Sequence, residues 1–183
     1  MSSTEATDPG LSATTASTAP EDAGGPVEYA LTGASRAIFT LDEEVRGTPT
    51  TVVGTSTIVL GEMLFDPSDN ASLQIGTILV NGRDLTTDSG NRNRAIRGPI
   101  LDVDTFEFIE FTPTSIDGFD GTGSSFTVTG DLTIRDITNA ATFEVTASLD
   151  GEVVTGTATT VVDRTQWVST FPTPPVWPTS PSR

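Results

Sequence analysis

Few side chains in this sequence could carry out chemistry, and the acidic ones come first. Glu107 and Glu110 lie close together on one predicted strand. Because successive side chains of a strand point to opposite faces, two glutamates three positions apart do not form a glycosidase carboxylate pair by themselves. Residues 66–70 (DPSDN) indicate a turn, since they lack the acidic ladder and final Glu of a calcium loop. These acids predict no catalytic residue and no metal site.

Missing residue types exclude most of the remaining reaction chemistry. The 183 residues contain no Cys and no His. Disulfides, thiol nucleophiles, thiolate zinc sites and Ser-His-Asp triads are therefore excluded. Nine Arg against 25 acids give a net charge of −16. This balance disfavours nucleic acid as a partner, because phosphates are neutralised by clusters of basic residues. We expect a protein that is not an enzyme and uses no cofactor.

One local group of basic residues stands out between positions 85 and 103. Arg92, Arg94 and Arg97 fall in a stretch whose four-residue spacing predicts a short helix, with Asp88, Ser89 or Asn91 as its cap. These arginines have two interpretations. They could pair with neighbouring carboxylates such as Asp88, Asp102 and Asp104, or they could contact an anionic ligand headgroup, for which the guanidinium fork is suited.

The elements that must position these residues are strands. Thr occurs 33 times and, with Val and Ile, fills short runs separated by Gly, Asp and Asn. From Phe126 to Arg135, apolar and polar residues alternate strictly, which predicts one buried and one exposed face. About eight antiparallel strands with one-sided burial predict an all-β barrel. The runs are 28–32, 35–45, 51–64, 72–81, 105–116, 124–136, 141–149 and 152–163.

An eight-stranded barrel is just wide enough either to be filled by side chains or to hold one small ligand. The inward faces mix large and small residues, which fits complementary packing or an elongated dry cavity for an alkyl or isoprenoid chain. The residues predicted to line such a cavity are Phe39, Leu41, Ile75, Leu79, Ile109, Phe111, Phe126, Val128, Gly130, Leu132, Phe143, Val145 and Ala147.

Composition divides the chain into three parts. Residues 1–27 are rich in Ser, Thr, Ala and Pro and predict a disordered linker, residues 28–170 predict the barrel, and residues 171–183 predict a Pro-rich tail. No apolar run is long enough to span a membrane, and the N-terminus does not have the pattern of a signal peptide. Trp167, beside the tail, could stack on a sugar ring or pack loosely on the barrel. The sequence predicts no defined oligomer.

Five stretches in this order resemble the YceI-like family: residues 35–39 (SRAIF), 54–61, 91–111, 126–143 and 156–167. The resemblance implies a lipocalin-like antiparallel barrel with a short helix beside it, exported or periplasmic, that binds a polyisoprenoid or other lipid in an internal tunnel without catalysis. It implies no catalytic residue.

The sequence departs from the family pattern at two places. The Pro that usually precedes the central strand is absent, and residues 106–108 (FEF) stand there. The second departure is at the C-terminal end. Family domains usually close with a strand after the segment that matches 163–168, and here five Pro occupy residues 172–183. Proline does not donate ladder hydrogen bonds, so we expect the barrel to be open along its C-terminal edge. The leading function is non-catalytic binding of a long-chain amphiphile. The alternative is a ligand-free extracytoplasmic barrel with a solid core, used for surface display or protein contact.

Overall fold

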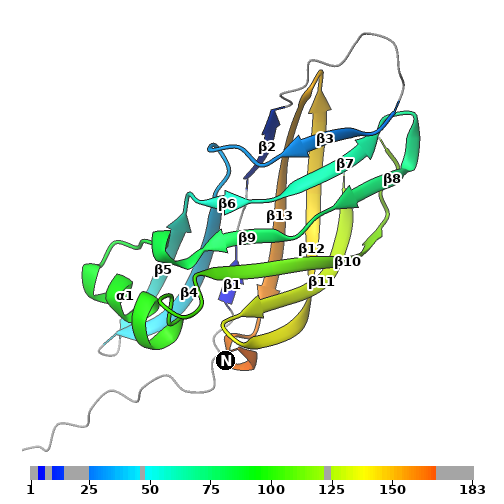
Figure 1. The fold of residues 1–183 in the computed structure, drawn as a ribbon. Helices are drawn as coiled ribbons and strands as arrows, with labels where there is room; N and C mark the ends of the chain where they lie inside the picture. The colour runs from blue at the N-terminus through cyan, green and yellow to red at the C-terminus, as the bar shows by residue number, and fades with distance from the viewer. Residues whose placement is uncertain (1–3, 7–9, 15–24, 46–47, 122–124, 168–183) are drawn as a thin grey trace, which may run out of the picture.

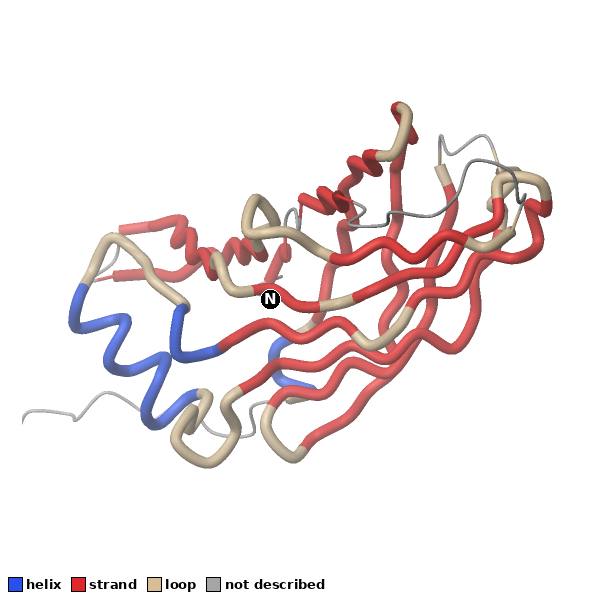
Figure 2. Tube along the Cα trace, turned by 45° about the horizontal axis from the view of Figure 1, so that its top comes forward, coloured by secondary structure: helices blue, strands red, loops and turns tan. Residues whose placement is uncertain are grey.

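The computed structural model describes residues 4–6, 10–14, 25–45, 48–121 and 125–167. The predicted tail at 171–183 lies outside these residues. Strands dominate, as expected, and helical turns are short (Figures 1 and 2). The strands are β1 (Thr4–Ala6), β2 (Gly10–Thr14), β3 (Val27–Ala30), β4 (Ala37–Val45), β5 (Thr48–Ser56), β6 (Val59–Leu60), β7 (Glu62–Asp66), β8 (Asp69–Ile75), β9 (Ile78–Asn81), β10 (Phe108–Asp117), β11 (Phe126–Ile134), β12 (Ile137–Asp150) and β13 (Val153–Val162).

The strands form two antiparallel sheets. Ten strands make one sheet in the order β5-β4-β1-β13-β12-β11-β10-β9-β6, with β2 also paired to β13. The strands β3, β7 and β8 make a second, smaller sheet. The large sheet curls into a half-barrel, and the small sheet lies across its open side near the turn between β12 and β13 (Figure 1). The lipocalin-like, all-β class predicted from the sequence is confirmed.

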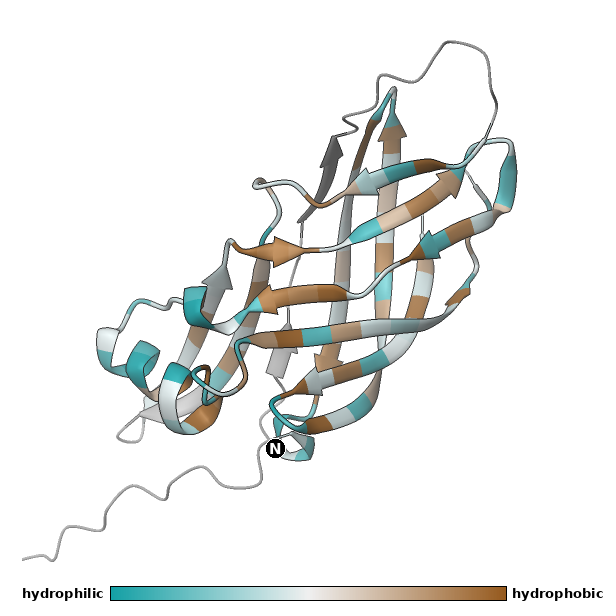
Figure 3. Cartoon of the chain, viewed as in Figure 1, coloured by the Kyte–Doolittle hydropathy of each residue, from teal (hydrophilic) through white to brown (hydrophobic). Residues whose placement is uncertain are grey.

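The alternation of residue types explains which face of each central strand is buried. On β11, Phe126, Val128 and Leu132 are buried, and the intervening threonines are not. Threonine hydroxyls pair across the outer face instead, as between Thr129 and Thr142 at 2.9 Å. Figure 3 shows the same alternation as brown bands between pale and teal ones along the strands. Side chains of period two thus give the sheet an apolar inside and a polar outside.

The long predicted strands 51–64 and 72–81 are each interrupted, and the interruptions carry the chain between the sheets. The first divides into β5, β6 and β7, and the second divides into β8 and β9 at Gly76 and Thr77. The Gly76 amide donates to the carbonyl of Glu62 at 2.9 Å, which anchors the break. A two-residue break changes the phase of the following strand, so β9 presents different residues inward from those that continuous alternation predicts.

The edge of β13 is paired, which differs from the open C-terminal edge expected from the sequence. Thr4 to Ala6 pair with Val162 to Thr160, and Gly10 to Thr14 pair with Thr157 to Val153. Strand β1 also pairs with Leu41 and Thr40 of β4. These N-terminal strands lie within the stretch that composition predicts to be a linker. Backbone groups make a ladder whatever the side chains are, so a Ser- and Thr-rich segment can complete a sheet edge.

The predicted short helix is present and covers one end of the half-barrel. α1 (Gly90–Ala95) begins at Ser89, whose side chain accepts a hydrogen bond from the Arg92 amide, and it continues into a π-helical turn, η2 (Ile96–Ile100). Two 3-10 turns, η1 (Gly82–Asp84) and η3 (Arg164–Gln166), follow β9 and β13. The side chains of Leu85, Ile96, Leu101 and Val103 form a buried cluster that packs on Phe39, Ile100, Ile109 and Ile134. In the described part of the chain, no helix is long and apolar enough to cross a membrane.

An apolar cavity as the candidate functional site

The curled sheet, the small sheet and α1 border a cavity of about 560 Å³. Sites for small molecules commonly measure about 300–1,000 Å³. The wall is almost entirely aliphatic and aromatic. Of the thirteen residues predicted to line it, these eleven do: Phe39, Leu41, Ile75, Ile109, Phe111, Phe126, Val128, Leu132, Phe143, Val145 and Ala147.

The structure places Leu79 outside the lining. Leu79 pairs with Leu60, which is 50 % exposed, and with Glu110 on the outer face of the large sheet. Its neighbours Ile78 and Val80 line the cavity in its place. The cause is the break at Gly76 and Thr77, which reverses the inward set between β8 and β9.

Gly130 is buried but does not border the empty space either. The ring of Phe111 covers it so closely that an added Cβ would lie 2.8 Å from a ring carbon and 2.4 Å from the carbonyl oxygen of Thr112. A strand glycine of this kind marks a close approach of another group. The absence of a side chain at Gly130 therefore makes room for the Phe111 ring and does not add empty volume to the cavity.

Sequence reasoning missed a group of aromatic residues at the small sheet. Tyr29, Phe65 and Phe119 line the cavity. The Phe119 ring makes edge-to-face contacts with Phe65 and Phe126, with centroids 5.4 and 5.1 Å apart. Burial, with a smaller contribution from Glu152, raises the pKa of the Tyr29 phenol. Tyr29 and Phe65 come from short strands, and Phe119 comes from a loop, so no long alternation marks them; their aromatic character is the only signal.

The two ends of the cavity differ in polarity. Strand β13 runs from the turn at Gly151 to Val162, about 33 Å for its ten residues. Near the turn, Ser148 and Leu149 of β12 border the cavity. At the opposite end, where α1 and η3 lie (Figure 1), Arg92 and Arg164 border it. We call this the helical end.

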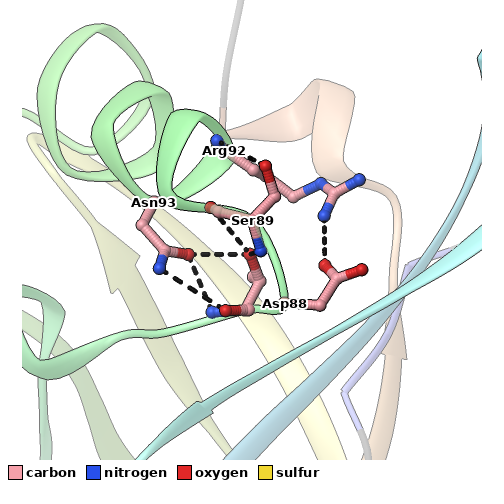
Figure 4. A network of polar contacts seen from close by, with 5 residues as sticks. Asp88, Ser89, Arg92 and Asn93 are labelled. Atoms are coloured by element: carbon pink, nitrogen blue, oxygen red, sulfur yellow. Dashed lines mark hydrogen bonds and ion pairs between the residues drawn. The ribbon is translucent and has the colours of Figure 1, made fainter.

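The three arginines singled out in the sequence have different roles. Arg92 forms an ion pair with Asp88 beside the capping contacts of Ser89 and Asn93 (Figure 4), and it alone of the three lines the cavity. Arg97 donates to the carbonyl of Leu85 from Nε at 3.2 Å and from Nη2 at 2.9 Å. Arg94 donates to Asn91 at 3.1 Å.

The interpretation that these arginines pair with acids therefore holds for Arg92. Arg97 instead binds a backbone carbonyl and so holds the helical segment against residue Leu85. The expected partner Asp104 instead binds Arg83, with Arg83 Nη1 donating to its Oδ1 at 3.2 Å.

Other polar groups take structural positions. Glu107 accepts from the Asn81 side chain at 3.0 Å and lies 3.7 Å from Arg83. The Asp66 carboxylate accepts from the hydroxyl and the amide of Ser68 at 2.6 and 2.8 Å, which lowers the Asp66 pKa. The turn predicted at 66–70 is present between β7 and β8, at residues 67 and 68. Trp167 is 2 % exposed, and its Nε1 donates to the Leu132 carbonyl at 2.9 Å, so it is not available to stack on a sugar. The described residues contain no group of acids able to hold a metal ion.

Comparison with known proteins agrees with this geometry. The YceI-like domain family matches residues 29–178. A crystal structure of Burkholderia cenocepacia BcnA is similar in fold, with a TM-score of 0.53 and 16 % sequence identity over 72 % of this chain and 99 % of that one. No curated protein matches the chain. The family match covers most of the sequence, including every strand that borders the cavity from β4 to β13. The chain belongs to the YceI-like family, whose members are generally β-barrel binding proteins.

Proposed function

We propose that the chain binds a long-chain amphiphile, a polyisoprenoid or a fatty acyl lipid, in its apolar cavity and does not catalyse a reaction. The observation that carries this proposal is a cavity of about 560 Å³ walled by aliphatic and aromatic side chains from both sheets. The ligand-free display module considered from the sequence would need a filled core, which this cavity argues against. An exported or periplasmic setting, as in the family, completes the proposal.

The physics of the wall favours a hydrocarbon chain over a polar molecule. Two hydroxyl residues of the wall illustrate this: the Thr160 hydroxyl donates to the Thr142 carbonyl at 2.7 Å, and the Ser148 hydroxyl shares a hydrogen bond with the Thr155 hydroxyl at 3.0 Å. These polar atoms are satisfied within the protein, so little in the wall would repay a polar ligand for its lost water. A hydrocarbon gains about 0.8 kcal/mol for each CH₂ removed from water. Affinity then comes from burial, and the polar end of the ligand belongs at the rim.

A large side chain introduced into the cavity tests the proposal. Strand β12 offers a matched pair of positions for it, because Ala147 and Ala140 lie on its opposite faces. Ala147 lines the cavity, whereas Ala140 is exposed on the outside of the same strand. Ala147→Phe puts a ring where the chain would lie, and Ala140→Phe is the matched control. Native mass spectrometry of purified protein, mixed with hexadecanoate or with a twenty-carbon isoprenoid alcohol, measures the bound fraction.

We expect a one-to-one complex for the wild type and for Ala140→Phe, and a strong loss for Ala147→Phe with an unchanged far-UV spectrum. Two results would overturn the proposal. One is the absence of complex with either lipid in the wild type. The other is undiminished binding by a folded Ala147→Phe variant.

A further inference from the structure

The charged groups around the cavity are unevenly placed, and this unevenness concerns the polar end of a ligand. Among the described lining residues, the charged side chains are Arg92, Arg164 and Glu62. Both arginines lie at the helical end, one from α1 and one from η3. Glu62 belongs to β7 of the small sheet and is exposed. Two elements distant in sequence thus bring two guanidinium groups to one end of an apolar wall.

Contacts with the apolar elements fix both arginines at this end. The turn η2, which continues α1, contributes Ile96 to a buried cluster, and Ile134 at the end of β11 packs against the same cluster. The residue after η3, Trp167, shares a buried cluster with Leu132, and Ile134 and Ile137 of the same hairpin pack against that cluster. The helical elements that carry Arg92 and Arg164 therefore pack against the same β11–β12 hairpin. The β12–β13 turn, with Leu149, lies at the far end of β12.

Two acids lie close in sequence to these arginines, Asp88 before Arg92 and Asp163 before Arg164. The Arg92 side chain is 23 % exposed, whereas its partner Asp88 is 83 % exposed. Asp163, next to Arg164, uses Oδ1 to accept from the amide and the hydroxyl of Thr165 at 2.9 and 2.7 Å. A guanidinium carries five N–H donors in a planar fork, so it can bind a second anion beside its first. The apolar wall lowers the local dielectric and strengthens such a contact.

We infer that the cavity selects an amphiphile with one anionic end, a carboxylate or phosphate, which binds Arg92 and Arg164 at the helical end while its chain extends past Phe143 toward Ala147. This inference rests on the proposed function and adds the charge and direction of the ligand. The net charge of −16 does not prevent it, because salt near 0.15 M screens exposed charges beyond about 8 Å.

Three ligands with one chain length separate charge from burial: dodecanoate, dodecanamide and dodecylammonium. Calorimetric titration at pH 7.5 in 0.15 M salt measures their affinities, below the concentrations at which they form micelles. We expect dodecanoate to bind at least about tenfold more tightly than the amide, as charge-assisted hydrogen bonds permit. Dodecylammonium should bind most weakly.

Charge-neutral variants then locate the anion. R92Q and R164Q should each reduce the preference for dodecanoate over the amide, and together they should bring it to within twofold of unity without weakening the amide. R94Q is the matched control, because Arg94 is on the same helix but contacts Asn91 and does not line the cavity. It should keep the full preference.

The outcomes distinguish this inference from the function on which it rests. Equal binding of dodecanoate and dodecanamide by the wild type would overturn the anion assignment and leave the lipid cavity intact. A full preference retained by the folded double variant would also overturn it. Failure of all three ligands to bind would overturn both the assignment and the proposed function.

Discussion

Trp167 offers a sharp test of how the barrel is held together at its helical end. Its ring is 2 % exposed and shares a buried cluster with Leu132 and Ala141. Its Nε1 donates to the Leu132 carbonyl at 2.9 Å. The side chain therefore contributes both apolar packing and one buried hydrogen bond. Two substitutions separate these contributions. Phenylalanine keeps an apolar ring but loses the hydrogen bond, and alanine loses both the ring and the hydrogen bond.

The expected costs follow from these contacts. Trp167→Ala leaves a cavity in a packed cluster, which costs about 3–5 kcal/mol. Trp167→Phe fills most of that space but leaves the carbonyl without its side-chain donor, which costs about 1–3 kcal/mol. For a domain of this size each kcal/mol lowers the Tm by about 2–4 °C, so the alanine variant should melt about 6–20 °C lower.

Urea unfolding followed by far-UV circular dichroism measures the free energies, and calorimetry measures the Tm. Val161→Ala is the control, since Val161 is 63 % exposed and its loss should change stability by less than about 0.5 kcal/mol. The reasoning is refuted if Trp167→Ala costs no more than Val161→Ala. It is also refuted if the phenylalanine variant is as unstable as the alanine variant.

Three further predictions use other features of the chain. Gly130→Ala should cost about 1–3 kcal/mol, because its Cβ would meet the Thr112 carbonyl, whereas Gly33→Ala meets no atom within 4 Å and should be nearly neutral in urea unfolding. The pKa of Asp84 is lowered below its ordinary 3.8, chiefly by the Thr57 amide donating to it at 2.5 Å. Asp84→Asn should therefore lose about 1 kcal/mol at pH 7, and this difference should shrink as pH falls through the folded pKa, as unfolding at several pH values would show. If the cavity holds an alkyl chain, shortening a fatty acid by two CH₂ should weaken binding about 15-fold in titration, and a flat series would contradict burial.

Much of the cavity wall could be predicted because β11 and β12 alternate without interruption. Phe126, Val128 and Leu132 on one strand, and Phe143 and Val145 on the next, follow directly from period two. The alternation reports the environment of each side chain, and an unbroken strand preserves its phase along its whole length.

Breaks and close contacts explain what the sequence did not reveal. Leu79 lies outside because two residues between β8 and β9 reverse the phase, and nothing in the apolar run marks that position except Gly76. Gly130 is covered by the ring of Phe111 on the neighbouring strand. That contact depends on the register between the two strands, which the sequence of either strand does not reveal. Arg164 contributes to the rim because β13 ends beside the helical elements. The spacing of residues around Arg164 in the sequence does not indicate that these elements lie close together.

Composition was an incomplete guide to the N-terminal segment. The scarcity of large aliphatic side chains between positions 1 and 27 predicts a linker, and that inference considers only side chains. Strands β1 and β2 are defined by backbone pairing with β13 and β4. A sheet edge with unpaired amides and carbonyls accepts such a segment with little regard to its sequence.

This pairing has a consequence for the order in which the chain folds during synthesis. Thr4 leaves the ribosome 158 residues before its partner Val162. At about 5–20 residues per second the segment waits roughly 8–30 s before the strand that receives it exists. Contacts of such long sequence separation form late, because the closure of so large a loop must precede them. A segment in which Leu11 is the one large aliphatic residue between Thr4 and Thr14 is suited to that wait, since it offers little that aggregates.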